Sequence, residues 1–443
     1  MKNSAEYKYL ARLSAPIVVG QLGVTIQGVV DTIMLGQYST TALAAAGFVN
    51  SIFTLASVIV MGFSYGIIPL SGAAYGRGDT KECGNVLRTG VATTAIFSVL
   101  AIIILCSLFI RPQIFGQPEE LIPQIHDYFW WVIPSLLLVG LSGAFKSFFD
   151  SITHTKVAMW AILISNVWNI VWNIFLIYGT CGFPELGVTG AAIATSSSRL
   201  ILVLIYIIGM AYFKAFRPYW QAFLKSRMPL KTIEMQCRMG VPTAVQSGLE
   251  ISAFSLCAVM AGWLGTEAQA THQIMINIAT TIWMVYFGIG SAVAIRVSNF
   301  VGQGNIASIR NSALCGIKMI MLSAVILNGL FLIFHDALFA MFTPDKHLIM
   351  GLHALILPLV LYQFGDALQT NYLSALRGLG RVKFLIIDAF IAYFIVSLPL
   401  SYIFGFTFSF GLPGIWMGFP FALTTAAALY IWRFLRYTRF KEK

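Results

Sequence analysis

Three carboxylic acids lie deep inside long apolar stretches of this sequence: Asp31, Glu250 and Asp366. A charged side chain inside a bilayer is costly, and such residues commonly line the path of an ion or a substrate. A carboxylate in that position holds a cation or takes up a proton. The acids therefore predict reversible binding of a positive charge.

Neutral polar residues accompany the two acids in the second half of the chain. Helical spacing gives each of three apolar segments one oxygen-rich face. These faces contain Thr243, Gln246, Ser247 and Glu250; then Gln273, Asn277, Thr280 and Thr281; then Tyr362, Asp366 and Gln369. They predict a hydrated cavity with two carboxylates, lined also by Gln246, Gln273 and Asn277.

Two carboxylates that share such a cavity repel each other and are costly to ionise together. A bound Na⁺, a proton or a cationic substrate relieves that repulsion. The ion and the substrate are therefore expected to exclude one another at Glu250 and Asp366, which is what an exchange mechanism requires. Tyr362, one helical turn before Asp366, would add a neutral oxygen or a ring contact.

The first half has a second polar set around Asp31. Gln27 lies one turn before Asp31, and Asn169 and Asn173 share one face of a later segment at similar depth. Asp31 and the two asparagines are therefore expected to meet across helices. For Asn169, Asn173 and Tyr362 a structural role as interhelical hydrogen-bonding groups is an equally good interpretation.

Four further charged residues fall inside apolar segments: Lys146, Arg199, Arg296 and Asp388. Lys146, Arg296 and Asp388 lie close to segment ends, where snorkelling or surface pairing is expected. Arg199 lies deeper, and the sequence does not indicate its partner.

The composition requires a membrane around these residues. The chain has 443 residues, of which 58% are hydrophobic and only 10% charged, and its mean hydropathy is +0.81. The apolar stretches are long and lack the period-2 alternation of a β-barrel. We predict an all-α polytopic membrane protein with twelve spans at about 14–36, 42–70, 86–110, 128–149, 157–178, 186–212, 239–262, 270–300, 312–334, 348–376, 384–408 and 414–435.

The basic residues predict the orientation of these spans. With the N-terminus in the cytoplasm, only Arg111 and Lys346 of the 28 Lys and Arg residues fall in outward loops. This asymmetry follows the positive-inside rule and places both termini in the cytoplasm. The net charge of +11 is thus topological, and nucleic-acid binding is not expected. No cleavable signal peptide is expected either.

An internal repeat divides the spans into two sets of six. A shift of 226 residues places Pro16 on Pro242, Gly36 on Gly262 and Gly62 on Gly288. We therefore predict an N-terminal lobe (1–213), a cytoplasmic linker (214–238) and a C-terminal lobe (239–443), related by an axis along the membrane normal. In this alignment Asp31 falls on Cys257, Glu250 on Val24 and Asp366 on Gly140. Each half is thus expected to build its fold without the acids of the other, so packing does not require them.

Motifs of other protein classes are missing from the sequence. It has no Walker sequence for ATP and no HExxH zinc motif, and its six cysteines lack metal-binding spacing. An integral-membrane enzyme would need a nucleophile–base pair or a metal cluster, so we predict no enzyme and no cofactor. A flippase for lipid-linked precursors is the remaining alternative, although its diphosphate substrate would favour a basic cavity.

The sequence resembles the multidrug and toxic compound extrusion (MATE) transporters, and within them the NorM-like bacterial branch. The resemblance covers nearly the whole chain. It lies in "APIVVGQLGVTIQGVVDTIMLG", "YGRGD", "VGQGN", "GLEISAF", "LYQFGDALQ" and "ALRGLGRVK". It implies two six-helix lobes around a cleft, in a monomeric protein of the bacterial inner membrane that exports organic cations in exchange for Na⁺ or H⁺.

The resemblance also implies roles for individual residues. Glu250, Tyr362 and Asp366 match the family's C-lobe cation site, and Asp31, Asn169 and Asn173 match its N-lobe site, with Thr195 as a further member. Pro16 matches a proline associated with bending of the first helix. Some proton-coupled relatives carry an acid where Asn173 stands. We therefore favour Na⁺, because two carboxylates with neutral oxygens suit a hard cation.

Overall fold

Helices form every regular element that the structure describes. The computed structural model describes residues 2–109 and 118–439, and no strand occurs within these ranges. The predicted all-α class is thus confirmed. Arg111, one of the two basic residues predicted on the outer side, lies outside the described residues.

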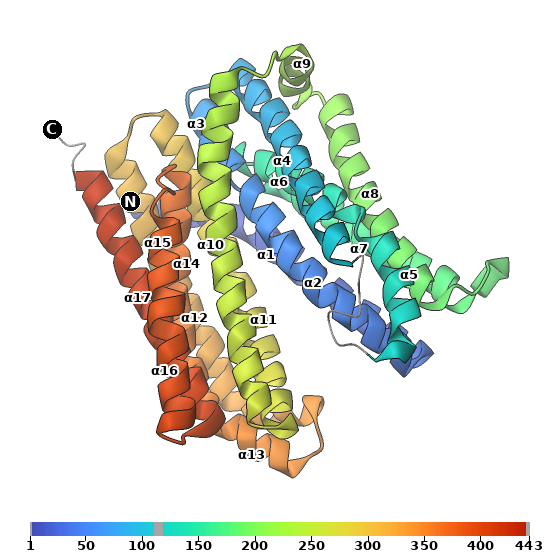
Figure 1. Cartoon of the computed structure of the whole chain (residues 1–443). Coiled ribbons are helices and arrows are strands. Elements are labelled where there is room, and N and C mark those ends of the chain that lie inside the picture. The colour runs from blue at the N-terminus through green and yellow to red at the C-terminus, as the bar shows by residue number, and fades with distance from the viewer. Residues whose placement is uncertain (1, 110–117, 440–443) are drawn as a thin grey trace. The chain divides into compact units, whose positions relative to one another are not determined.

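Among the described residues, the first half contains eight α-helices and the connection to the second half contains one (Figure 1). Their bounds are α1 (Lys2–Tyr38), α2 (Thr40–Ser64), α3 (Ile67–Gly76), α4 (Thr80–Phe109), α5 (Ile122–Val132), α6 (Ser135–Ser151), α7 (Thr155–Tyr178), α8 (Gly187–Tyr212) and α9 (Arg217–Lys225). Single 3₁₀ turns occur at Glu119–Leu121 and Thr180–Gly182.

The second half has a continuous helix, α11 (Thr266–Gly302), where the first half has α2 and α3, and it contains π-helix near its end. Its elements are α10 (Leu230–Trp263), α11 (Thr266–Gly302), α12 (Ile306–Phe342), α13 (Lys346–Ala354), α14 (Ile356–Gly378), α15 (Leu385–Ala389), the π-helix η4 (Phe390–Ser397), α16 (Leu398–Tyr402), the π-helix η5 (Ile403–Thr407) and α17 (Gly411–Arg439).

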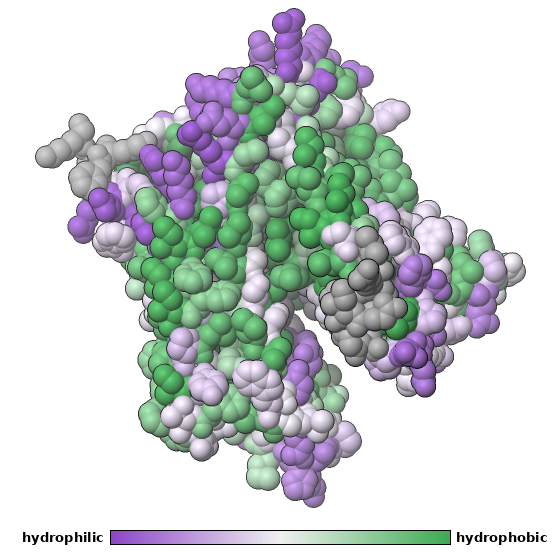
Figure 2. Space-filling model, viewed as in Figure 1, coloured by the Kyte–Doolittle hydropathy of each residue, from purple (hydrophilic) through white to green (hydrophobic). Residues whose placement is uncertain are grey.

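Twelve segments among the described residues are long and apolar enough to cross a membrane, if one bent pair counts as a single span. Eleven are continuous or nearly so, and the twelfth is α13 with α14, which meet at 47°. This bent pair corresponds to the predicted span 348–376. Figure 2 shows hydrophobic side chains along the helix flanks and hydrophilic ones gathered toward helix ends, which is the distribution that a bilayer demands.

The chain packs into two compact units that differ from the predicted lobes at the first helix of each half. One unit contains residues 19–244, and the other contains 1–18 with 245–443. The two boundaries, after Val18 and after Ala244, are 226 residues apart. Each half thus gives the first segment of its first helix to the unit built mainly by the other half.

Paired glycines allow these exchanged segments to approach closely. A Cβ atom on Gly62 of α2 would lie 3.0 Å from the Ala244 Cα atom, and one on Gly288 of α11 would lie 3.3 Å from the Val18 Cα atom. Gly62 matches Gly288 in the repeat, and Val18 matches Ala244. The same helix crossing therefore occurs once in each unit.

The predicted linker is folded onto the unit that contains residues 19–244. In α9 the last turn lies beside Arg88 of α4, whose Nη1 atom donates to the carbonyls of Leu224 and Ser226 at 2.8 Å each. Arg88 thus satisfies carbonyl groups that the end of a short helix leaves without intrahelical partners.

Candidate functional site

Glu250 lies at the centre of a hydrogen-bonded cluster in the unit that contains residues 245–443. Its Oε1 atom accepts from Gln369 Nε2 at 2.8 Å and from the Tyr393 hydroxyl at 2.7 Å. Its Oε2 atom accepts from Gln246 Nε2 at 2.8 Å. Three neutral donors therefore surround the two carboxylate oxygens of Glu250.

Arg377 fixes which way the Gln246 amide points. The Arg377 Nη2 atom donates to Gln246 Oε1 at 2.6 Å. A guanidinium has only donors, so the amide oxygen must face Arg377 and the amide nitrogen must face Glu250. Arg377 thus supports Glu250 through one intervening side chain.

Asp366 has a very different environment on α14. Its side chain is 2% exposed. Its Oδ1 atom accepts a long hydrogen bond of 3.3 Å from Thr370 Oγ1, and its Oδ2 atom has no hydrogen-bond partner among the residues described. A buried carboxylate oxygen without a donor is costly unless a proton or a cation occupies that side. The charges of Glu250 and Asp366 also act on one another.

Of the other predicted members of this site, Gln246 joins the carboxylate hydrogen bonds, whereas Tyr362, Gln273 and Asn277 make no hydrogen bond to Glu250 or Asp366 among the described residues. Tyr362 is buried, and its ring packs among Phe254, Trp416 and Phe419 with centroids 5.9–6.2 Å apart. Gln273 and Asn277 share an exposed face of α11. Gln246 is fully buried and acts as a hydrogen-bond partner of Glu250.

Tyr393 and Arg377 take part in the cluster although sequence reasoning assigned neither to it. Tyr393 lies in the π-helix η4, whose wider turn changes which residues share a face. An α-helical count along this segment therefore does not identify Tyr393. Arg377 was placed on the cytoplasmic side by its charge, and its reach back to Gln246 has no sequence signal.

The polar set around Asp31 is assembled in the unit that contains residues 19–244. Asn173 Nδ2 lies 2.5 Å from Asp31 Oδ1 and 3.2 Å from Asn169 Oδ1. Asn169 Nδ2 lies 3.4 Å from Thr195 Oγ1. The structure thus brings Asp31, Asn169, Asn173 and Thr195 together from three helices.

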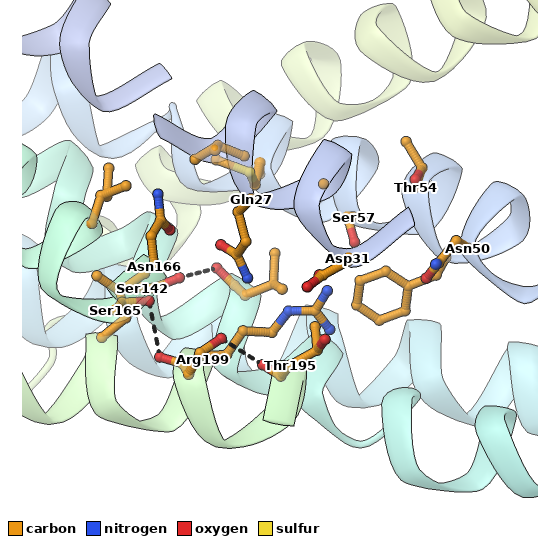
Figure 3. A pocket seen from close by; sticks show the side chains of 18 of the residues that line it. Gln27, Asp31, Asn50, Thr54, Ser57, Ser142, Ser165, Asn166, Thr195 and Arg199 are labelled. Carbon is orange, nitrogen blue, oxygen red and sulfur yellow. Dashed lines mark hydrogen bonds between the residues drawn. The ribbon is translucent and has the colours of Figure 1, made fainter. Parts of the chain in front are cut away.

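A cavity of about 540 Å³ opens beside Asp31. Figure 3 shows Asp31, Gln27, Asn50 and Thr195 around it, with the Arg199 guanidinium directed toward Asp31. The cavity is large enough for a drug-sized molecule and combines apolar walls with a few polar groups. Asn50, which accepts from the Tyr128 hydroxyl at 3.2 Å, was not identified from the sequence.

Arg199 is held on the wall of this cavity by groups that the sequence did not indicate. It donates to the Ser135 hydroxyl, and its guanidinium lies 4.2 Å from the centre of the Phe53 ring. Arg199 and Asp31 also interact electrostatically. Asp31 therefore has a cationic neighbour, unlike Asp366.

Three charges predicted to be snorkelling or paired at the surface are instead partners in shielded ion pairs. Lys146 Nζ lies 2.8 Å from Asp150, with side chains 13% and 3% exposed. Asp388 is fully buried against Arg433 of α17. Because the two charges of each pair are buried together, neither is left without a partner in the apolar interior.

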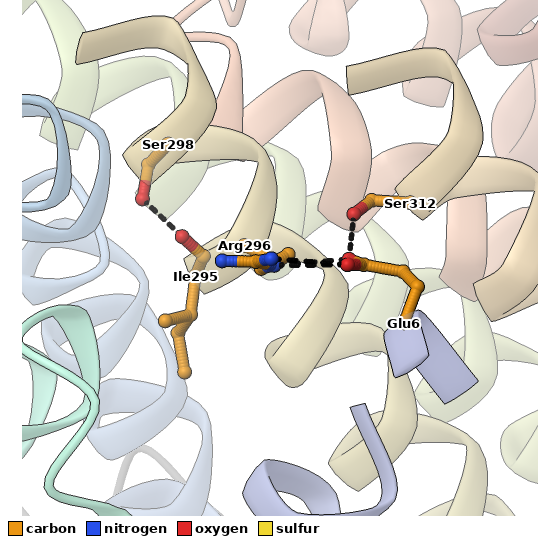
Figure 4. A network of polar contacts seen from close by, with 5 residues as sticks. All are labelled: Glu6, Ile295, Arg296, Ser298 and Ser312. Carbon is orange, nitrogen blue, oxygen red and sulfur yellow. Dashed lines mark hydrogen bonds and ion pairs between the residues drawn. The ribbon is translucent and has the colours of Figure 1, made fainter. Parts of the chain in front are cut away.

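The third of these charges, Arg296, binds the beginning of α1. Its Nε and Nη2 atoms lie 3.0 Å from the two oxygens of Glu6, and Ser312 also donates to Glu6 (Figure 4). The guanidinium lies 4.1 Å from the Phe300 ring centre. This network fixes the first segment of α1 to α11 and α12.

A family model agrees with the internal repeat. The model, MatE, matches residues 16–175 and again residues 242–403. The two matches begin at Pro16 and Pro242, which is the offset of the internal repeat. The chain belongs to the MatE family. It is therefore a membrane transporter and not an enzyme.

Relatives of this chain match it over nearly their full length. A probable multidrug resistance protein NorM of Idiomarina loihiensis is 28% identical over all of this chain and 96% of its own length. The multidrug resistance protein NorM of Vibrio cholerae is 27% identical over 96% of this chain and 94% of its own.

Solved structures show the same fold. A eukaryotic MATE transporter superposes with a TM-score of 0.90 at 18% identity, covering 100% of this chain and 99% of its own. An outward-facing multidrug resistance MATE family transporter gives a TM-score of 0.89 at 19% identity, covering 99% and 97%. The MatE fold thus positions the acids of this chain.

Proposed function

We propose that this protein is a secondary antiporter that exports bulky organic cations in exchange for Na⁺ or H⁺. Its relatives carry the name multidrug resistance protein, which supports a multidrug substrate range. We further propose that it works as a monomer in the bacterial inner membrane with both termini in the cytoplasm, and that it needs no cofactor besides the coupling ion.

The unequal surroundings of Glu250 and Asp366 carry this proposal. Glu250 accepts hydrogen bonds from three side chains, whereas Asp366 is buried with one oxygen that has no donor among the described residues. Asp366 is then the group whose charge state changes. An arriving ion neutralises Asp366, and a cationic substrate competes for the same negative charge.

Asp31 and its cavity supply the second part of the proposal. The cavity offers apolar walls for an organic substrate and Asp31 for its positive charge. Because Asn173 and Arg199 already interact with Asp31, we propose that Asp31 orients the substrate while Asp366 couples transport to the ion. We favour Na⁺ over H⁺ as the coupling ion because Asn173 stands where some proton-coupled relatives carry an acid.

Ethidium transport by the purified protein in proteoliposomes tests this assignment. A Na⁺ gradient is expected to drive wild-type transport more strongly than a H⁺ gradient. Asp366→Asn should abolish the ion dependence, and Asp31→Asn should impair transport at normal expression. Ser57→Ala, which removes a hydroxyl from the same cavity wall, is the matched control. Unchanged ion-driven transport by Asp366→Asn would place coupling elsewhere.

A further inference from the structure

Two histidines and an aspartate converge outside both polar sites, where α12 approaches α13. His335 and Asp336 belong to the last turns of α12, and His353 belongs to α13. Their side chains are 23%, 75% and 41% exposed, so water and dissolved ions reach them. Figure 1 shows α13 at one end of its unit, beyond the long helices.

Main-chain carbonyls determine the tautomer of both imidazoles. His335 Nδ1 lies 2.9 Å from the Leu332 carbonyl oxygen, and His353 Nδ1 lies 2.8 Å from that of Ile349. A carbonyl oxygen only accepts, so each Nδ1 atom carries the hydrogen. Each Nε2 atom of the neutral ring is therefore left with a free lone pair.

Both Nε2 atoms lie close to the same carboxylate oxygen. Asp336 Oδ1 lies 2.8 Å from His353 Nε2 and 3.5 Å from His335 Nε2, and the three ligand atoms all lie within 4.8 Å of one another. Three acceptors in such proximity repel each other unless a cation lies among them. A metal ion and a proton are the two cations that fit.

The ring packing holds both imidazoles in this arrangement. The His335 and His353 ring centroids lie 5.3 Å apart with planes at 85°. Phe339, which is fully buried, packs edge-on against both rings at 5.8 and 5.4 Å. The ligand atoms are thus positioned by contacts that do not involve a metal.

We propose that His335, Asp336 and His353 form a binding site for a borderline transition-metal ion, with Zn²⁺ as the type case. Two imidazole nitrogens and one carboxylate oxygen are the donor set that Zn²⁺ accepts, and water completes its four-coordinate shell. Mg²⁺ and Ca²⁺ require more oxygen ligands. The Nδ1–carbonyl hydrogen bonds are the outer-shell contacts that metal-binding histidines usually have.

A metal at this site joins two helices that no other polar side-chain contact links among the described residues. It fixes α13, the first limb of the bent pair, to the end of α12. The second limb of that pair is α14, which carries Asp366. Zinc binding is therefore expected to restrict the bend between α13 and α14.

Calorimetric titration of the tag-free, detergent-purified chain with ZnCl₂ tests the site. Wild type is expected to bind one Zn²⁺ and no Mg²⁺ under the same conditions. His353→Ala and Asp336→Asn should weaken Zn²⁺ binding at least about tenfold, because loss of an outer-shell partner alone costs that much. His347→Ala, an exposed histidine on the same helix, should leave binding unchanged.

Thermal unfolding gives a second measurement that does not depend on transport. Zn²⁺ should raise the unfolding temperature of wild type and of His347→Ala, but not of His353→Ala or Asp336→Asn. If wild type binds no Zn²⁺, or if the two ligand variants bind it as wild type does, the cluster is only a histidine–aspartate ion pair and the proposal fails.

Discussion

Glu250 and Asp366 are chemically similar side chains, but their hydrogen-bond partners differ. Replacing each acid by its amide should therefore cost a different amount of stability. Glu250 accepts three hydrogen bonds, whereas Asp366 accepts one long bond. Replacing a carboxylate oxygen by an amide nitrogen removes an acceptor and adds a donor. The two isosteric substitutions should therefore differ in their effect on stability.

Glu250→Gln is expected to lower the free energy of unfolding by about 1–3 kcal/mol, the usual cost of a buried polar group without a partner. The new amide nitrogen would face Gln246 Nε2, and Arg377 prevents the Gln246 amide from turning over. Asp366→Asn should change stability by less than about 1 kcal/mol, since Oδ2 has no donor to lose.

Thermal unfolding of both variants in detergent would measure this difference. Equal losses for the two variants would mean that the Glu250 hydrogen bonds do not stabilise the fold. A separate transport assay should find the double variant little worse than either single one, because the two acids act as one site.

At the scale of elements, close helix packing depends on individual glycines. A Cβ atom on Gly378 of α14 would lie 2.4 Å from the Ala294 carbonyl oxygen and 3.0 Å from the Ala294 Cα atom of α11. Both are backbone atoms that cannot turn aside. Gly329 of α12 has no atom within 4 Å of the same position.

Gly378→Ala is therefore expected to destabilise the protein by about 1–3 kcal/mol, the usual cost of overpacking. Gly329→Ala should leave stability unchanged or raise it by up to about 1 kcal/mol, because alanine favours a helix over glycine. Melting temperatures of the two variants provide the comparison. A stable Gly378→Ala variant would show that α11 and α14 separate readily.

The same scale explains what could be predicted from the sequence. Hydropathy and the 226-residue repeat were sufficient for the apolar spans, because both depend on local residue types. The π-helix at Tyr393 and the 47° bend between α13 and α14 depend on packing between distant segments. The proposed zinc ligands could not be predicted for the same reason. His335 and His353 lie on different helices, and only the packing of α12 against α13 brings them together.

The burial of individual charged residues was predicted less well than the helices that carry them. Asp31, Asn169 and Asn173 were expected to meet because their depths matched, and they do meet. Asp388 was expected near a surface, yet Arg433 makes its full burial possible. A partner so distant in sequence cannot be identified from spacing alone.

For the whole molecule, the charge asymmetry predicts the orientation in the membrane. Twelve spans, with α13 and α14 counted as one, and an inward excess of Lys and Arg predict that both termini lie in the cytoplasm. A reporter that is active only outside the cytoplasm should give no signal when fused after Lys443. The same reporter fused within the segment after Phe342, which lies between two spans, should be active. A strong signal at Lys443 would contradict an even number of spans.

The exchange of first-helix segments links the order of synthesis to the order of packing. Residues 1–18 leave the ribosome long before the residues they pack against, which begin at 245. Gly62 likewise packs against Ala244, which is synthesised 182 residues later. Contacts of such large sequence separation form late in folding. The first six spans therefore cannot complete their packing when they enter the membrane. If synthesis ends at the linker, residues 1–18 lack the segment against which they pack.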